Sequence, residues 1–574
     1  MLCPPYNLEN IVMKNILLTL LISGFTFSSV SAQLYPEDYD NIDFAFDSLY
    51  SVKYQKYMRS KDSVALIQLY AALDDKIKSA STTNELIITN STIHTLPAGI
   101  SELSKVEKVI FANCRNLDLP KVIEQLSVLD GLKSLAIINC GIYSLPDNIS
   151  SLSGLTSLNI KENKIVRLPS SLVELKSLRS LNVSNNSILN EDLLFELLAK
   201  MPYVKHLEAN YCAIRALPEV GVSQFVQIGL AGNMLTQLNR EIKAVQIDLS
   251  ANPYLDLETT IDQLASNKQL KVLDLGFNKW KVLPASIGKL NSLESLNLRG
   301  NKLITLPEEI GSLLNLKVLK VDNPDIYLHT NKLTSLPTSI GKLTQLDSLY
   351  LSGNKLSTLP ASIGKLSNLQ FLDLSWNALE SFPKSLLSLS NLKHLNLAIN
   401  HVLTIPEEIG NLENLNYLNC QGDFFVNYQL KIKSIPNSIA KLVNLKTLIL
   451  SDNVIEELPA GIETCTQLDV LDLKDNLLST LPESIGKLVV LRELNLKANE
   501  IVDLPETFAK LSSLEYLNLA FNFNINSSSA AVSIKSLSKL KELNITDSYF
   551  NDAAVQLLME ALPQTSIVTK VPEK

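Results

Sequence analysis

The side chains best suited to chemistry are the cysteines and histidines, and their spacing tests for an enzymatic or metal-binding role. The chain has 6 Cys and 5 His among 574 residues. Neither the CxxC spacing of zinc and redox sites nor a Cys/His ligand spacing occurs. There is no GxxxxGK(S/T) phosphate loop, and no GxGxxG, HExxH or GxSxG in a fitting context. We therefore expect no catalytic residue, no metal and no cofactor.

Five of the cysteines stand where a buried residue is expected. Cys114, Cys140 and Cys212 occupy a recurring Asn position, Cys420 replaces a strand Leu, and Cys465 replaces the Leu of an IGxL segment. Free thiols in the protein interior are the favoured interpretation. An oxidised pair between Cys114 and Cys140 is the alternative, because the two residues belong to neighbouring units.

The recurring position belongs to a repeat of 23 residues, as the numbering of Asn354, Asn377 and Asn400 shows. Each unit reads LxxLxLxxNxL and then xxLPxxIGxL. The alternating LxL predicts a short strand, while Pro and a Gly that permits the turn, as at Gly341, predict a short helical or 3-10 return. Stacked units of this length predict a solenoid with one parallel sheet.

This pattern resembles the typical class of leucine-rich repeats, which occurs in Ras-group-related proteins of plants and animals and in many bacterial surface proteins. The resemblance covers about Leu86 to the end of the chain. It implies an α/β solenoid of horseshoe shape, with a concave parallel β-sheet and short helical or 3-10 segments on the convex side. It also implies protein binding, but it does not identify the partner.

The chain divides into four expected segments. Residues 1–33 predict a signal peptide with Met13 as a candidate start, because a short basic region precedes an apolar run at 16–27 and Val30 and Ala32 fit a cleavage site. The alternative is an apolar arm packed on the first coil. Residues 34–84 predict a helical N-terminal cap, 85–550 an array of about 20 coils, and 551–574 a C-terminal capping helix and tail.

Departures from the period mark local changes. An Asn at the recurring position can satisfy a buried N–H and C=O of neighbouring coils. Three coils follow their predecessors by 26 residues, and the segment EDLLFELLA at 191–199 predicts a fuller convex helix. Two coils place Pro324 and Asp423 at the Asn position and are followed by steps of 30 residues. Each holds about seven extra residues, and the two insertions leave the same edge of the sheet four coils apart.

Aromatic residues gather on the outward strand positions between these insertions. On the other strands, the central outward position is usually Asn or Asp. Aromatic rings with polar tips on a rigid sheet suit a binding hot spot. The alternative is that the rings merely cover one another. Arg299 and Lys320 also interrupt the polar positions and are candidates for pairing with an acidic partner. The predicted ligand-binding residues are Tyr350, Phe371, Trp376, His394 and Tyr417 on the sheet, and Tyr327, Phe424 and Phe425 on the insertions.

These features predict a non-enzymatic protein-binding scaffold that is secreted or periplasmic in a bacterium, with a glycan as a less favoured ligand. A net charge of −8 argues against nucleic acid. No membrane span is expected after signal cleavage, and the sequence does not indicate the oligomeric state. The alternatives are a structural spacer of the cell envelope and, if the apolar start is not cleaved, a cytosolic signalling scaffold.

Overall fold

A computed structural model describes residues 84–218, 221–238, 242–323, 331–423 and 431–570. The chain separates into two compact units, Met1–Lys76 and Ile77–Lys574, and all described residues belong to the second. The predicted signal peptide and nearly all of the predicted N-terminal cap lie outside the described residues. No helix among the described residues is long and apolar enough to cross a membrane.

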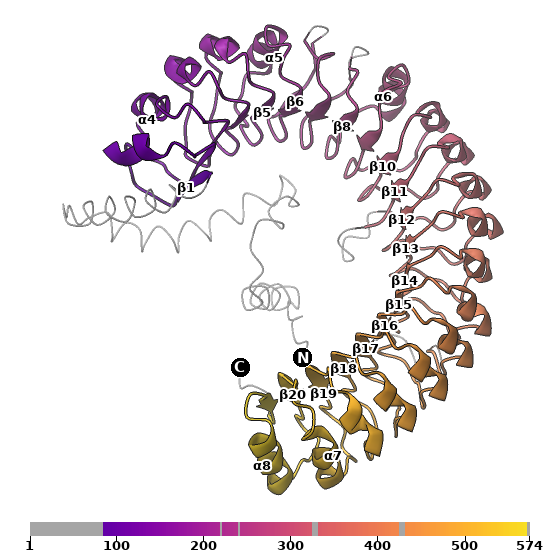
Figure 1. Ribbon diagram of the computed structural model, residues 1–574. Helices are drawn as coiled ribbons and strands as arrows, with labels where there is room; N and C mark the ends of the chain where they lie inside the picture. The colour runs from indigo at the N-terminus through magenta and orange to yellow at the C-terminus, as the bar shows by residue number, and fades with distance from the viewer. Residues whose placement is uncertain (1–83, 219–220, 239–241, 324–330, 424–430, 571–574) are drawn as a thin grey trace, which may run out of the picture. The chain divides into compact units, whose positions relative to one another are not determined.

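The strands of successive coils pair in parallel to form a 21-stranded sheet that lines the inner side of the array (Figure 1). Each strand from β2 to β20 pairs with the strands of the preceding and following coils, and Leu commonly stands beside Leu, as in Leu349↔Leu372. This confirms the predicted concave parallel sheet. The strands are β1 (Glu85–Thr89), β2 (Lys108–Ala112), β3 (Ser134–Ile138), β4 (Ser157–Asn159), β5 (Ser180–Asn182), β6 (His206–Glu208), β7 (Gln227–Gly229), β8 (Gln246–Asp248), β9 (Val272–Asp274), β10 (Ser295–Asn297), β11 (Val318–Lys320), β12 (Ser348–Tyr350), β13 (Phe371–Asp373), β14 (His394–Asn396), β15 (Tyr417–Asn419), β16 (Thr447–Ile449), β17 (Val470–Asp472), β18 (Glu493–Asn495), β19 (Tyr516–Asn518), β20 (Glu542–Asn544) and β21 (Ser566–Val568).

Short 3-10 segments return on the outer side, and each begins directly after a proline whose backbone is extended, as at Pro360 (φ −66°, ψ 145°). The fixed φ of proline favours this entry. They are η1 (Ala98–Glu102), η2 (Asp147–Ser151), η3 (Ser170–Glu174), η4 (Ala285–Lys289), η5 (Glu308–Ser312), η6 (Thr338–Lys342), η7 (Ala361–Lys365), η8 (Lys384–Ser388), η9 (Glu407–Asn411), η11 (Asn437–Lys441), η12 (Ala460–Thr464), η13 (Glu483–Lys487) and η14 (Glu506–Lys510).

The glycine of the IGxL segment has a different role from the one predicted. A Cβ at Gly341 would lie 2.3 Å from the backbone oxygen of Ser362 in the next coil. The absence of a side chain therefore lets neighbouring 3-10 segments approach closely, rather than permitting a turn.

Coils of 26 residues carry full α-helices on the outer side. These are α4 (Leu119–Leu126), α5 (Glu191–Ala199), α6 (Leu257–Leu264) and α7 (Ser527–Ile534). The helix predicted at 191–199 is confirmed. Each helix begins after an Asp or Asn whose side chain accepts a hydrogen bond from the N–H three residues later, as Asn190 does from Leu193 (2.9 Å). Such caps satisfy the otherwise unpaired first turn.

The Asn position holds neighbouring coils together, as predicted. In one coil Asn377 donates to the carbonyl oxygens of Leu351 (3.0 Å) and Leu374 (2.9 Å) and accepts from the N–H of Leu356 (3.0 Å). Equivalent buried side chains satisfy backbone groups in coils along the array. At the C-terminal end, α8 (Asp552–Ala561) is followed by β21, which pairs with β20. The sequence pattern did not indicate this last strand.

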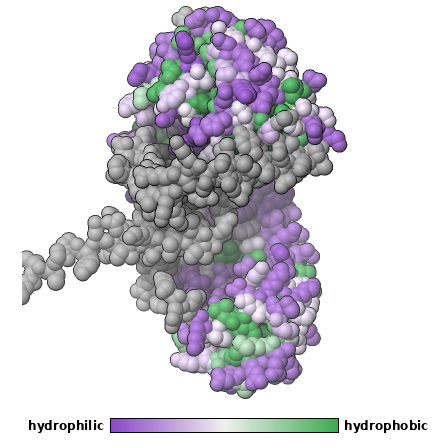
Figure 2. Space-filling model, turned by 90° about the vertical axis from the view of Figure 1, so that its left-hand side faces the viewer, coloured by the Kyte–Doolittle hydropathy of each residue, from purple (hydrophilic) through white to green (hydrophobic). Residues whose placement is uncertain are grey.

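Hydrophilic residues predominate on the face of the molecule shown in Figure 2, and hydrophobic residues form small separate groups there. The core instead consists largely of leucines at the centre of each strand and on either side of it. Leu346, Leu349 and Leu351 are examples, and none of them is exposed. The solenoid thus buries one continuous apolar interior between the sheet and the 3-10 segments.

Candidate functional site

The central outward position of the strands has a structural role that explains why Asn and Asp recur there. The side-chain oxygen accepts a hydrogen bond from the backbone N–H two residues later, where the strand has ended. Asp373 accepts from Ser375 (2.9 Å) and Asn396 from Ala398 (3.1 Å). The same bond forms at Asn159, Asn182, Asp248, Asp274, Asn297, Asn419, Asp472, Asn495, Asn518 and Asn544. This local bond accounts for the polar row without a ligand.

Between β8 and β20, Lys320, Tyr350 and Ile449 interrupt this polar row, on β11, β12 and β16. The first two lie side by side in register, and the Nζ of Lys320 lies 5.4 Å from the centroid of the Tyr350 ring. A cation at this distance from a ring is attracted to its electron-rich face. The interruption therefore replaces the common backbone bond with a pair of side chains that face outward.

Four rings from consecutive strands form a stack, which we call the aromatic column: Tyr350, Phe371, His394 and Tyr417. The ring centroids are 4.6 Å apart for Tyr350–Phe371, 4.3 Å for Phe371–His394 and 3.9 Å for His394–Tyr417. The last two pairs are nearly parallel, at 14° and 8°. The structure therefore brings four of the predicted site residues together.

The members of the column come from two rows of the sheet. Phe371, His394 and Tyr417 stand in register at the first position of their strands, whereas Tyr350 stands in register with Asp373 at the third position. Tyr350 therefore reaches Phe371 diagonally, which explains its larger interplanar angle of 32°. Diagonal neighbours on a sheet are within reach of aromatic side chains.

Stacking determines which part of each ring faces outward. Neighbouring rings cover the faces of Phe371 and His394, and Lys320 lies over the Tyr350 ring. The column therefore presents mainly ring edges and the polar tips of Tyr350, His394 and Tyr417. Ring edges carry partial positive charge, so they favour oxygen atoms over C–H groups.

The imidazole of His394 is half-buried between two rings, and this burial lowers its pKa to about 4. Its ordinary value is 6.5. Desolvation disfavours the charged form because neither neighbouring ring offers a carboxylate to stabilise it. His394 is therefore neutral at pH 7 and supplies both a hydrogen-bond donor and an acceptor.

The prediction that Arg299 is available to an acidic partner is wrong. Its guanidinium is paired with Asp322, with Nη2 2.8 Å and Nε 3.1 Å from the carboxylate. Asp322 is only 5% exposed. A fork of donors on a buried carboxylate is a structural pair that joins adjacent coils.

Trp376 does not join the aromatic column. It lies half-buried in the turn after β13, with a positive φ of 54°, and its backbone N–H donates to the carbonyl of Ala398 (2.9 Å). In the part of the chain that the structure describes, no ring contact links it to the other four. The predicted site residues Tyr327, Phe424 and Phe425 lie outside the described residues.

The first insertion corrects the assignment of Pro324 to the Asn position. Asn331 takes that place: it donates to the carbonyls of Leu298 (3.1 Å) and Val321 (3.2 Å) and accepts from the N–H of Leu303 (3.1 Å). The extra residues 324–330 therefore precede the Asn position. The side chain of Asn323 joins both ends, since it accepts from the N–H of Asn331 (2.7 Å) and donates to its carbonyl (3.0 Å).

The five described cysteines are free and buried, which confirms the core interpretation over an oxidised pair. The backbone N–H of Cys114 lies 3.4 Å from the sulfur of Cys140, and the hydrogen bond between the two side chains together with burial raises the pKa of Cys140. Among the residues that the structure describes, no group of three or more His, Cys, Asp or Glu could hold a metal ion.

Sequence reasoning missed a hollow of the concave face on β18, β19 and β20, apart from the aromatic column. It is lined by Glu493, Tyr516 and Glu542 in one row and by Asn495, Asn518 and Asn544 in the next, with a volume of about 340 Å³. The sequence did contain a sign of this hollow: at the first position of these three strands, Tyr516 stands between Glu493 and Glu542.

Comparisons with known families match more than half of the chain to leucine-rich repeats. The family described as "Leucine-rich repeat region" matches residues 337–430 and 425–567. The family described as "Leucine rich repeat" matches 130–188, and that described as "Leucine Rich Repeat" matches 292–313. Comparison with curated proteins gives no match.

Several solved structures are similar to the chain. A complex of TLR13 with ssRNA13 is 21% identical, with a TM-score of 0.52 over 85% of this chain and 81% of that one. A leucine-rich repeat protein of Leptospira interrogans is 26% identical, with a TM-score of 0.44 over 86% of this chain and 98% of that one. The plant peptide hormone receptor RGFR1 in complex with RGF2 is 22% identical, with a TM-score of 0.44 over 85% and 89%. The first of these likenesses supports the repeat fold.

Proposed function

Because the chain belongs to the leucine-rich repeat proteins, we propose that it is a non-enzymatic scaffold that binds a protein partner on its concave face, at the aromatic column. The observation that carries this proposal is the interruption of the polar row. Most strands place Asn or Asp where a backbone N–H needs an acceptor, whereas β11 and β12 place Lys320 and Tyr350 there. A surface that gives up a stabilising bond for half-buried, outward-facing side chains is a candidate for function.

The orientation of the rings favours a protein over a glycan. A sugar packs its C–H groups against the electron-rich face of an aromatic ring. Neighbouring rings cover both faces of Phe371 and His394 and one face of Tyr417, and Lys320 lies over Tyr350. The outward edges and the tips of Tyr350, His394 and Tyr417 instead suit the carbonyl and side-chain oxygens of a polypeptide. Rigid aromatic anchors of this kind lose little conformational entropy on binding.

Replacing Tyr350, Phe371 and Tyr417 with Ala tests this proposal. Protein captured by the wild type from the envelope fraction and medium of the source organism should be lost by the triple variant. The matched control is Tyr254→Ala together with Tyr143→Ala, because these tyrosines are 67% and 60% exposed and lie away from the column. Circular dichroism and urea unfolding check that each variant is folded.

A milder pair of substitutions separates binding from packing. Tyr350→Phe with Tyr417→Phe keeps the stack and removes only two hydroxyl groups, so it should weaken capture at unchanged stability if the tips bind the partner. Undiminished capture by the triple variant would refute the proposed site.

An envelope spacer is the second candidate, favoured by the same stacking. If the rings serve only to cover one another, the triple variant should lose stability without losing any partner. The cost of removing three stacked pairs would then be about 1.5–4.5 kcal/mol, at about 0.5–1.5 kcal/mol a pair.

Secretion or a periplasmic location is also part of our proposal. It rests on the apolar run at 16–27 and on Val30 and Ala32 at the expected cleavage site. The mass of the mature N-terminus tests it, since cleavage should leave Gln33 as the first residue. An intact apolar start would favour a cytosolic scaffold instead.

A further inference from the structure

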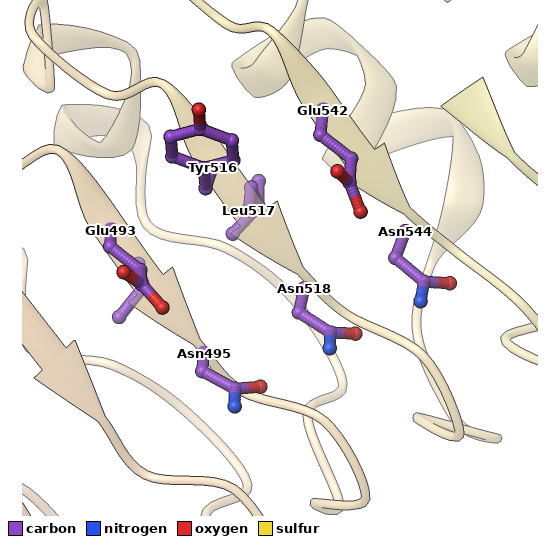
Figure 3. A pocket seen from close by; sticks show the side chains of 8 residues that line it. Glu493, Asn495, Tyr516, Leu517, Asn518, Glu542 and Asn544 are labelled. Carbon is purple, nitrogen blue, oxygen red and sulfur yellow. The ribbon is translucent and has the colours of Figure 1, made fainter. Parts of the chain in front are cut away.

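We propose a second binding site at the hollow on β18–β20, which takes an Arg- or Lys-bearing extended segment of a partner protein. Glu493, Tyr516 and Glu542 stand in register on adjacent strands, and Tyr516 is 43% exposed. Figure 3 shows the two glutamates on opposite sides of the Tyr516 strand, with the three asparagine amides beside them in the next row. The strands β16 and β17 separate this site from the aromatic column.

The charges around the hollow do not balance. In the row just before the first strand position, Arg492 pairs with Asp469 and Lys541 pairs with Glu515 (2.6 Å), so these four charges cancel. In the part of the chain that the structure describes, Glu493 and Glu542 make no ion pair. The hollow therefore carries two uncompensated carboxylates.

The ring of Tyr516 adds to the attraction for a cation. The Nζ of Lys541 lies over this ring, 5.9 Å from the centroid, but Tyr516 is still 43% exposed, so part of the ring is open to a ligand. Two carboxylates beside an aromatic ring are complementary to a guanidinium or ammonium group. At the far side of the hollow, Lys497 lies over Phe521 at 5.2 Å and so is engaged with another ring.

The asparagine row favours a peptide over a free amine. The Oδ1 atoms of Asn495, Asn518 and Asn544 accept from the backbone N–H groups two residues later, at 3.1–3.2 Å. This bond fixes the amides and leaves their Nδ2 groups with no acceptor among the described residues. In Figure 3 these groups lie on the side of the row away from the glutamates, where they can donate to a segment that extends past the row. Backbone carbonyl oxygens of an extended segment are the natural acceptors.

The size of the hollow suits a short segment. Three adjacent strands span about 10 Å at a spacing of about 4.8 Å. An extended chain rises about 3.3 Å per residue, so about three residues cross the site. One basic side chain can then lie between the two carboxylates while its neighbours contact the amides.

The test uses the full-length protein and the capped peptide acetyl-Gly-Gly-Arg-Gly-Gly-amide, with dissociation constants from saturation-transfer NMR at physiological ionic strength. Glu493→Gln with Glu542→Gln removes both charges and keeps the shape, and should raise the dissociation constant at least fivefold. The matched control is Glu456→Gln with Glu457→Gln, two exposed glutamates outside the hollow, which should change it less than twofold. This control removes the same net charge, so it separates local recognition from general attraction.

Agmatine, a free guanidinium compound, tests the contribution of the peptide backbone and should bind at least fivefold more weakly than the peptide. Absence of saturable binding, equal losses in the two double variants, or agmatine binding as tightly as the peptide would each overturn the inference. The Tyr350/Phe371/Tyr417 triple variant should bind the peptide normally, so this inference and the proposed function can fail separately.

Discussion

Replacing Asn377 with Ala is the most direct test of how the coils are held together. This side chain is 9% exposed and bonds to the backbone of its own coil and the preceding one. It follows the strand that carries Phe371 and bonds to the carbonyl of Leu374 at the end of that strand, so the substitution also tests the support of the aromatic column. The matched control is Asn391→Ala, because Asn391 is exposed and its one bond, to the carbonyl of Ser367 (2.8 Å), also joins neighbouring coils.

The bonds of neighbouring coils set the expected cost. The carbonyl of Leu351 also accepts from Asn354 (3.0 Å) and that of Leu374 also accepts from Asn400 (2.9 Å), so each keeps one partner after the substitution. The N–H of Leu356 loses its bond to Asn377 and is left buried. The amide also donates to the carbonyl of Ser375 (3.1 Å), which keeps a bond from the N–H of Gly353. One orphaned N–H costs about 1–3 kcal/mol and the two lost N–H donors of the amide about 0.5–1.5 kcal/mol each, which gives about 2–6 kcal/mol.

Urea unfolding and amide hydrogen exchange measure the effect. Asn377→Ala should lower the free energy of unfolding by about 2–6 kcal/mol and speed exchange in the coils that hold Leu351 and Leu374, whereas Asn391→Ala should cost less than about 1 kcal/mol. Because repeat units contact only their neighbours, distant coils should keep their exchange rates. Equal costs for the two variants would refute the structural role of the buried Asn.

Three further predictions concern titration and pairing. The folded pKa of His394 lies below its unfolded value, so the contribution of neutral His394 to folding stability is complete above about pH 6.5 and is lost as the pH falls toward 4. His394→Phe should therefore reduce the change in the free energy of unfolding between pH 7.5 and pH 5 by about 1 kcal/mol, after allowance for the partial exposure of the imidazole. A variant with an unchanged pH dependence would contradict the burial of the imidazole. Asn323→Ala should lower the free energy of unfolding by about 1–3 kcal/mol, because the side chain closes the base of the first insertion. A urea midpoint equal to that of the wild type within experimental error would contradict this role of Asn323. Arg299→Leu should lower the free energy of unfolding more in the wild type than in a protein that already carries Asp322→Asn, because the carboxylate partner is then absent. Equal losses in the two backgrounds of this double-mutant cycle would show that the pair is not coupled.

Much of the fold was predictable because the period and the residue types act locally. The LxL alternation determined the strands, the proline of each unit marked the start of a 3-10 segment, and the longer coil around 191–199 indicated α5. The hydrogen bonds of Asn377 were also predictable, since an amide has both a donor and an acceptor for the buried groups of neighbouring coils.

The errors arose where position along the chain does not determine position in space. Counting from β11 placed Pro324 at the Asn position, but the insertion precedes it and Asn331 performs the role. Arg299 looked available because its partner Asp322 lies 23 residues away, in the next coil. The strand β21 lacks the LxL signal, so only pairing with β20 identifies it.

The candidate site was predictable in composition but not in geometry. The sequence identified Tyr350, Phe371, His394 and Tyr417, but it did not distinguish rings that present their faces from rings that cover one another. That distinction depends on register and side-chain direction. It changes the expected ligand, because covered faces disfavour a sugar.

The closure of the first insertion by Asn323 and Asn331 makes this place suitable for grafting. The two residues keep the entry and exit of the segment together, and Asn331 restores the register of the next coil. A replacement for 324–330 that differs in length or sequence would therefore leave the coils on either side in place. Natural or designed variants of this protein can acquire a new recognition loop at this point while they retain the same sheet.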